Sequence, residues 1–169
     1  MSEDLPHATA VLAAGHWPAG EARDVVTLDF DDRHRRRKRY VGEGGFAFLL
    51  DLAEASVMRD GDGLALQGGG FVCVRAAPEP LVEVTAETAD KLARLAWHLG
   101  NRHLPAQIGE GRILIRDDHV IIRMLEGLGA RLRRVAAPFD PEGGAYGEHN
   151  RNPEHHHHHH GDGHHHHHD

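Results

Sequence analysis

The pattern of apolar and polar positions divides the chain into two folded halves and a tail. In the first half, short apolar runs rich in β-branched and aromatic residues are separated by glycine-rich turns, which predicts strands at residues 24–30, 46–50 and 71–74. A helical turn is expected only near residues 53–58. Several short strands joined by tight turns predict an N-terminal all-β domain, a small sandwich or barrel, over residues 1–76.

In the second half the apolar period lengthens to that of a helix. One helix is expected after Thr85, ending at Gly100, and another is expected after Asp117 or Asp118, ending at Gly129. Strands are expected around these helices, at residues 81–84, 104–108, 112–115 and 132–137. The order strand, helix, strand, strand, helix, strand predicts a ferredoxin-like βαββαβ domain over residues 77–147.

The two halves differ from the segments that join and follow them. Two prolines within residues 76–80 indicate an extended linker between the domains. Residues 148–169 are histidine with a few polar residues, so they cannot form a core and are expected to be disordered. The predicted class is therefore α+β, with a histidine-rich tail.

Charge and composition narrow the classes of protein to consider. The 169 residues carry 19 Lys and Arg against 26 Asp and Glu, a net charge of −7, which argues against a general nucleic-acid binder. No apolar run is long enough to cross a membrane, and the acidic N-terminus is unlike a secretory signal. Cys73 is the sole cysteine, so no internal disulfide can form, and a cytoplasmic protein is expected.

The basic run at residues 33–39 raises the alternative of a nucleic-acid-binding β module. No aromatic stacking pattern accompanies the run, and it leads directly into Tyr40 and Val41. A charged strand whose face meets solvent or an acidic protein explains it better, so no nucleic-acid partner is expected.

No group of residues indicates catalysis. Cys73 lies inside an apolar run, where a small buried side chain is expected rather than a nucleophile. Serine occurs only at Ser2 and Ser56, and neither belongs to a triad pattern. We expect a protein that is not an enzyme.

The tail carries the strongest chemical signal, since imidazole binds Zn, Cu, Ni and Fe and a flexible run can assemble several ligands around one ion. A purification tag is the alternative, but two runs interrupted by residues 161–163 and preceded by an isolated histidine favour a native metal-binding tail. The candidate ligands there are His149, His155, His156, His157, His158, His159, His160, His164, His165, His166, His167 and His168.

Two further histidines lie in the second predicted domain. His103 follows the first helix beside Pro105, and one such residue is insufficient for a site unless a two-fold dimer brings two copies together. His119 lies at the start of the second helix, where the helix dipole favours the neutral, ligand-competent ring. A neighbouring aspartate, Asp117 or Asp118, could add an oxygen ligand or orient that ring.

These features together resemble the UreE family of urease accessory metallochaperones. The most specific stretch is Trp97-His98-Leu99-Gly100-Asn101-Arg102-His103-Leu104-Pro105-Ala106-Gln107, which is similar to the family's G-N-R-H motif at a helix end. Residues 48–52, 59–62, 76–79, 118–120 and 138–146 are similar to other stretches of the family. The resemblance covers nearly the whole chain.

The resemblance implies a function and a set of site residues. It implies a homodimer formed through the second domain, with His103 of each chain holding one Ni²⁺, tail histidines adding ligands, and His149 completing the site. His119 would match a peripheral ligand position, although Asp117 stands where some members have a second histidine. The implied partners are the urease accessory GTPase and apo-urease, with no membrane.

Zn²⁺ or Cu²⁺ would also suit these ligands, and composition does not choose among the metals. A nickel or zinc storage protein that binds metal without donating it remains the main alternative.

Overall fold

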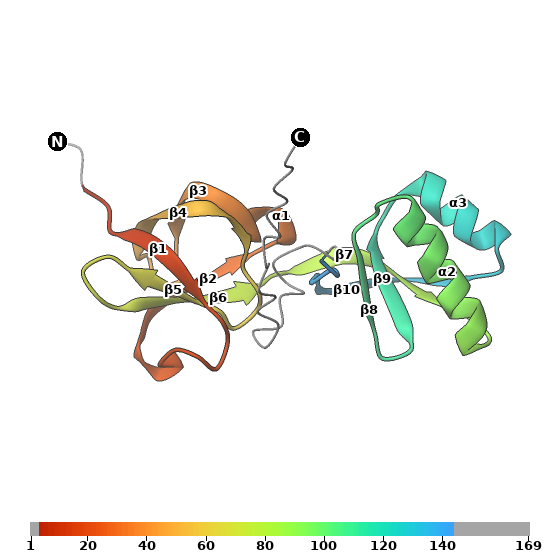
Figure 1. Ribbon diagram of the computed structural model, residues 1–169, viewed down its shortest axis with the longest axis horizontal. Helices are drawn as coiled ribbons and strands as arrows, with labels where there is room; N and C mark the ends of the chain where they lie inside the picture. The colour runs from red at the N-terminus through yellow and green to blue at the C-terminus, as the bar shows by residue number, and fades with distance from the viewer. Residues whose placement is uncertain (1–3, 144–169) are drawn as a thin grey trace, which may run out of the picture.

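The structure is a computed structural model that describes residues 4–143, and it contains two sheets that follow one another along the chain (Figure 1). The first sheet is formed by β1 (His7–Leu12), β2 (Ala22–Leu28), β3 (His34–Val41), β4 (Ala47–Val57), β5 (Gly63–Leu66) and β6 (Phe71–Ala76). It curls on itself in the order β2-β6-β5-β1-β4-β3, which confirms the N-terminal β prediction. Two short helices, η1 (Ala19–Glu21) and α1 (Phe30–Arg33), join its strands.

The core of this curled sheet comes from alternating strand positions. Phe48, Leu50 and Leu52 of β4 are buried, while every second residue between them is more exposed. Alternation of this kind is expected when one face of a sheet is covered. The helical turn predicted at residues 53–58 is wrong, because the end of β4 pairs with the start of β3, with Val57 opposite His34.

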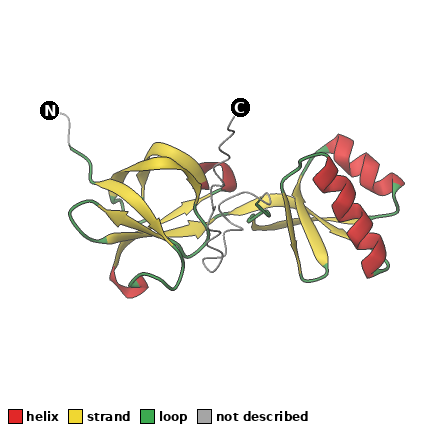
Figure 2. Cartoon of the chain, viewed as in Figure 1, coloured by secondary structure: helices red, strands yellow, loops and turns green. Residues whose placement is uncertain are grey.

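The second sheet confirms the ferredoxin-like prediction. Its elements are β7 (Pro78–Thr85), α2 (Ala89–Asn101), β8 (Ala106–Gly109), β9 (Arg112–Arg116), α3 (His119–Gly127) and β10 (Arg131–Pro138). The strand order is β10-β7-β9-β8, and every neighbouring pair is antiparallel. Both helices lie on one face of this sheet (Figure 2). Their apolar sides pack on the sheet through Leu95, Leu99, Ile121 and Leu125.

Two local predictions in this half are wrong in position. Thr88, not Thr85, caps α2, since its hydroxyl accepts a hydrogen bond from the Lys91 backbone N–H at 3.2 Å. The expected linker at residues 76–80 is largely strand, because β7 begins at Pro78, opposite Pro138 of β10. Prolines are tolerated there because β9 pairs with β7 only from Leu81 onward.

A buried arginine lies where the two sheets meet. Arg33 is 0% exposed, and its guanidinium donates to the carbonyls of Leu28 at 3.3 Å, Met58 at 3.1 Å and Phe139. Burial lowers the pKa of Arg33, and the nearby carboxylates of Asp140 and others oppose this. Because a buried guanidinium without partners would be costly, the three carbonyls fix the end of the second sheet against the first.

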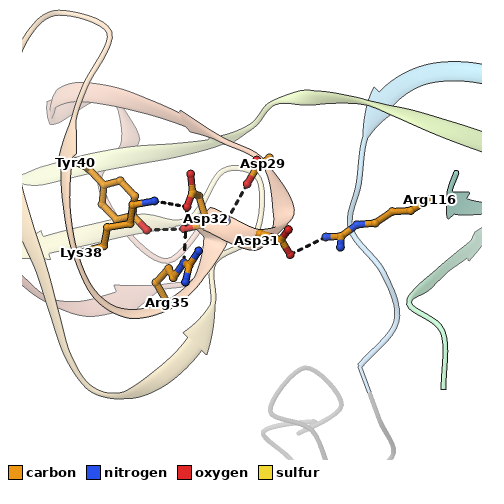
Figure 3. Close-up of polar contacts among 7 residues, drawn as sticks. All are labelled: Asp29, Asp31, Asp32, Arg35, Lys38, Tyr40 and Arg116. Carbon is orange, nitrogen blue, oxygen red and sulfur yellow. Dashed lines mark hydrogen bonds and ion pairs between the residues drawn. The ribbon is translucent and has the colours of Figure 1, made fainter. Parts of the chain in front are cut away.

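Contacts around α1 extend this junction. The rings of Phe30 and Phe139 meet edge to face, with centroids 5.7 Å apart, and Arg116 lies over both rings. Arg116 also donates to Asp31 at 2.9 Å, as Figure 3 shows. The two domains therefore share an apolar and charged interface. No helix within residues 4–143 has both the length and the apolar character needed to cross a bilayer.

Candidate metal site

His103 lies in a tight turn that ends α2. Its backbone has φ 56°, in the left-handed region, and its N–H donates to the Gly100 carbonyl at 3.0 Å. The N–H of Leu104 donates to the Leu99 carbonyl at 3.4 Å, and both of these leucines belong to the core beneath α2. This pair of bonds, with an apolar contact beneath it, is the Schellman motif. The helix thus continues past Gly100, the predicted end, and His103 takes the position that glycine usually occupies.

The left-handed conformation makes His103 an unusual helix terminator. A residue with a Cβ is less stable there than glycine, by roughly 1 kcal/mol. Such strain persists only where the surrounding structure enforces it, and it is concentrated at functional positions. The turn holds the backbone of His103 on a fixed scaffold while its imidazole remains exposed.

A groove of about 410 Å³ opens beside His103. Pro105 and Ile108 line it from the second domain, Phe30 lines it from the first, and the chain returning after β10 closes it. Glu142, on that returning segment, is the carboxylate among the lining residues. Glu142 and His103 line the same groove, and carboxylate and imidazole are both ligands of divalent ions. Sequence reasoning missed Glu142, because only the folded chain brings residues 141–143 back to the end of α2.

The exposed side of α2 carries an apolar surface next to the motif. Trp97 is 65% exposed and meets the ring of His98 edge to face, with centroids 5.1 Å apart. These two residues, with Ala93 and Arg94, line a hollow of about 470 Å³. The Trp97 side chain is therefore available for contact with another molecule.

The structure places His119 on a different element. It is the exposed first residue of α3, and Asp118 caps that helix by accepting hydrogen bonds from the Val120 N–H at 2.9 Å and the Ile121 N–H at 3.2 Å. The second aspartate, Asp117, is paired with Arg134. Both aspartates therefore already have structural partners, which leaves His119 with less support than the sequence indicated.

No group of three or more His, Cys, Asp or Glu within residues 4–143 is arranged to hold a metal ion. The predicted ligand His149 and those at residues 155–160 and 164–168 lie outside the described residues. One copy of residues 4–143 thus presents His103 as a single imidazole, so a complete coordination shell would need ligands from the tail or from a second chain.

Comparisons with known proteins match both halves of the chain. The model of the UreE urease accessory protein N-terminal domain matches residues 5–77, and that of the UreE C-terminal domain matches residues 79–168. A urease accessory protein UreE from Bradyrhizobium sp. strain BTAi1 is 57% identical over 141 residues, covering 83% of this chain and 68% of that protein.

Two further relatives agree. The UreE of Chelativorans sp. strain BNC1 is 55% identical over 78% of this chain and 83% of its own length. The UreE of Ruegeria pomeroyi is 50% identical over 90% of this chain and 98% of its own length. The two domain models together span nearly all of the folded part described above, and the chain belongs to the UreE urease accessory protein family.

Proposed function

We propose that this chain is a nickel-binding metallochaperone that delivers Ni²⁺ for assembly of the urease active site. Membership of the urease accessory family supports a role in urease maturation. The observation that carries the nickel assignment is His103, an exposed imidazole on a rigid turn within the family-like motif. The chemistry is ligand exchange, so no substrate bond is broken and no catalytic residue is assigned.

The metal site is shared between two chains. A two-fold axis beside the end of α2 would place two copies of His103 on one Ni²⁺, and the exposed Trp97 surface on the same helix would be covered by the second copy. In this arrangement each chain contributes one imidazole, that of His103, to a single metal site. Tail histidines, beginning with His149, would complete the coordination shell, while the later ones would collect further ions.

Nickel is the expected cargo, and Zn²⁺ or Cu²⁺ would bind the same ligands. Imidazole binds metal only when it is deprotonated, so affinity should fall as the solution is made acidic. His119 is assigned a peripheral role, in which it holds an additional ion weakly. A shared site with few fixed ligands suits a carrier, because the ion can leave when a better ligand set is offered.

The partners are the urease accessory GTPase and apo-urease, met in the cytoplasm. Within this scheme, residues 1–76 form the protein-contact domain, residues 77–147 bind metal and dimerise, and residues 148–169 form the metal-collecting tail. Each boundary can be tested by removing one part and measuring what is lost.

Nickel titration of three chains tests the proposal. The full chain should bind several ions, a chain truncated after Tyr146 should retain about one ion per dimer, and the truncated His103→Ala chain should lose it. Retention of every ion after truncation would contradict the collecting role of the tail. Tight binding by truncated His103→Ala would contradict the shared site.

The alternative is a histidine-rich nickel or zinc store without a donor role, and the length of the histidine tail favours it. The two functions separate in an assay of urease activation at limiting nickel. A donor raises the rate and yield of active urease when it is supplied with a fixed amount of metal, whereas a store lowers them. The chain without its tail is the matched control, since it retains only the shared site.

The basic run is not assigned to nucleic acid. Residues 34–39 of the run belong to β3, and several of their cations face carboxylates, since Asp32 meets Arg35 and Lys38 (Figure 3) and Asp51 lies 3.9 Å from Arg37. This local neutralisation weakens the field that would attract phosphates. A mobility-shift assay with RNA and DNA at low salt should show no complex, and a salt-sensitive shift would reopen this alternative.

A further inference from the structure

Glu142 lies against the strand that begins three residues after His103. Its backbone N–H donates to the carbonyl of Ala106, the first residue of β8, at 2.8 Å. The side chains of Glu142 and His103 are both exposed, and both line the groove of about 410 Å³. A hydrated cation that enters this groove therefore meets a carboxylate as well as an imidazole.

The backbone that carries Glu142 is held by contacts from both domains. The carbonyl of Phe139, a residue with no exposed surface, accepts a hydrogen bond from Arg33. Asp140 forms an ion pair with Arg59 at 2.7 Å. Both arginines belong to the first domain, whereas the acceptor of the Glu142 N–H belongs to β8. The carboxylate of Glu142 thus extends from a chain that is fixed beside His103, and a ligand on fixed backbone loses little entropy when it binds an ion.

The Glu142 carboxylate has no structural task among residues 4–143. Three other carboxylates of the second domain are engaged, since Glu83 pairs with Arg112, Asp117 pairs with Arg134 and Asp118 caps α3. Within the described part of the chain, no cation and no backbone N–H is bonded to the side chain of Glu142. It can therefore bind a metal ion without first breaking an ion pair.

The groove adjoins the surface that the proposed dimer covers. Ala96 and Gly100, one turn apart on α2, line the groove, while Ala93 and Trp97 of the same helix line the neighbouring hollow. A second copy that covers Trp97 therefore lies next to the groove as well. A two-fold axis at this place brings two grooves together, each with its own imidazole and carboxylate.

We propose that Glu142 is a ligand of the shared metal site, so that each chain contributes an imidazole nitrogen from His103 and a carboxylate oxygen from Glu142. This inference rests on the proposed function, because it assumes that two copies of His103 hold one ion. It goes beyond that function by assigning a second ligand within the folded part of each chain. Two copies supply two nitrogen and two oxygen donors, and a mixed N,O set of this kind suits Ni²⁺ or Cu²⁺ in tetragonal sites.

Nickel titration of Glu142→Gln tests the assignment in the chain truncated after Tyr146. Glutamine keeps the size of the side chain and the backbone N–H, but it removes the charged ligand. We expect nickel affinity to fall by at least about tenfold, the loss typical when even an outer partner of a metal site is removed. Glu126→Gln, at an exposed residue of α3 outside the groove, is the matched control and should keep the parental affinity. Parental affinity in Glu142→Gln would overturn the proposal.

Glu142→His separates metal binding from a purely electrostatic or structural role. Imidazole is itself a nickel ligand, so this variant should bind Ni²⁺ more tightly than Glu142→Gln and approach the parental affinity. A carboxylate that acted only through its charge could not be replaced by a neutral ring. Binding by Glu142→His as weak as that by Glu142→Gln would therefore overturn the proposal.

Urea unfolding accompanies each titration. The truncation removes no residue of the hydrophobic cores, and comparison with the full chain serves as its folding control. Equal free energies of unfolding for the parent and Glu142→Gln would assign the lost affinity to the carboxylate. A fall in stability that accounts for the lost affinity would overturn the proposal.

Failure of the proposed function gives a different result from failure of this inference. If no shared site exists, truncated His103→Ala binds nickel as tightly as the truncated parent. If the site exists without Glu142, His103→Ala loses the ion while Glu142→Gln retains it.

Discussion

His103 and Gly129 occupy the same position at the ends of the two helices of the second domain. Gly129 has φ 81°, donates to the Glu126 carbonyl at 3.0 Å and follows α3 in the same Schellman motif. One helix thus ends on the residue best suited to this turn, and the other ends on an imidazole. The turn itself favours glycine, so it does not explain the imidazole at His103.

Replacing His103 by glycine should stabilise the fold while it removes the proposed metal ligand. We expect the free energy of unfolding to rise by about 1 kcal/mol, because the left-handed backbone no longer carries a Cβ. Urea unfolding measures the first effect, and nickel titration of the truncated chain measures the loss of its site. Gly129→Ala is the control, which should destabilise by a similar amount and leave nickel binding intact. A fall in stability on His103→Gly would mean that the imidazole packs against its surroundings.

If the chain dimerises as proposed, Trp97→Ser should convert the dimer into monomers and abolish the proposed shared nickel site. The side chain is 65% exposed in a single chain, and its burial by a second copy would contribute about 2 kcal/mol or more. Sedimentation velocity gives the oligomeric state, and titration gives the metal. Val120→Ser, at a residue 62% exposed on α3, is the matched control and should leave the dimer intact. A dimeric Trp97→Ser protein would place the interface elsewhere.

His119→Ala should leave the first nickel site unchanged. Because Asp118 caps α3 and Asp117 pairs with Arg134, we expect His119 to hold an ion only weakly. Titration of the truncated chain at low metal concentration should give the parental affinity, with loss of at most a weak additional site. A large drop in the affinity for the first ion would instead make His119 part of the shared site.

Acid should destabilise the second sheet through Glu83. A hydrogen bond from Arg112, aided by Arg133, holds the pKa of Glu83 below its usual range although desolvation opposes this. A lowered folded pKa contributes stability above the unfolded value, about 4.3, and that stability is lost as pH falls through the folded pKa. The free energy of unfolding, measured with urea, should therefore fall less steeply between about pH 6 and pH 3 in Glu83→Gln than in the parent. Equal slopes would exclude Glu83 as a source of the pH dependence.

The sequence predicted the second domain better than the first, for a physical reason. The helices of residues 89–101 and 119–127 have long apolar stripes, so their period is easy to detect. The strands β1 and β5 were not predicted, because β1 has a mixed composition and β5 has only four residues. Both exist because they pair with each other inside the sheet, and a sequence pattern does not record such distant partners.

The candidate site was predictable in part. The motif around His103 locates the residue, but its left-handed backbone follows from a helix that ends at Asn101, one residue beyond Gly100. The groove could not be predicted, since Phe30 and Glu142 come from segments far apart in the sequence. Residues 141–143 reach the groove because buried contacts, such as that between Arg33 and Phe139, hold the chain after β10.

The pairing of Pro78 with Pro138 makes the second domain begin and end at one place. Directly opposed residues of an antiparallel pair lie about 5 Å apart, so the chain enters and leaves the second domain at neighbouring points, and the Arg116–Asp31 ion pair adds a separate contact with the first domain. The first and last residues of the domain's sheet therefore lie side by side, next to the first domain. Loops at its far end, such as Glu110 and Gly111 between β8 and β9, could be lengthened or exchanged without disturbing that attachment.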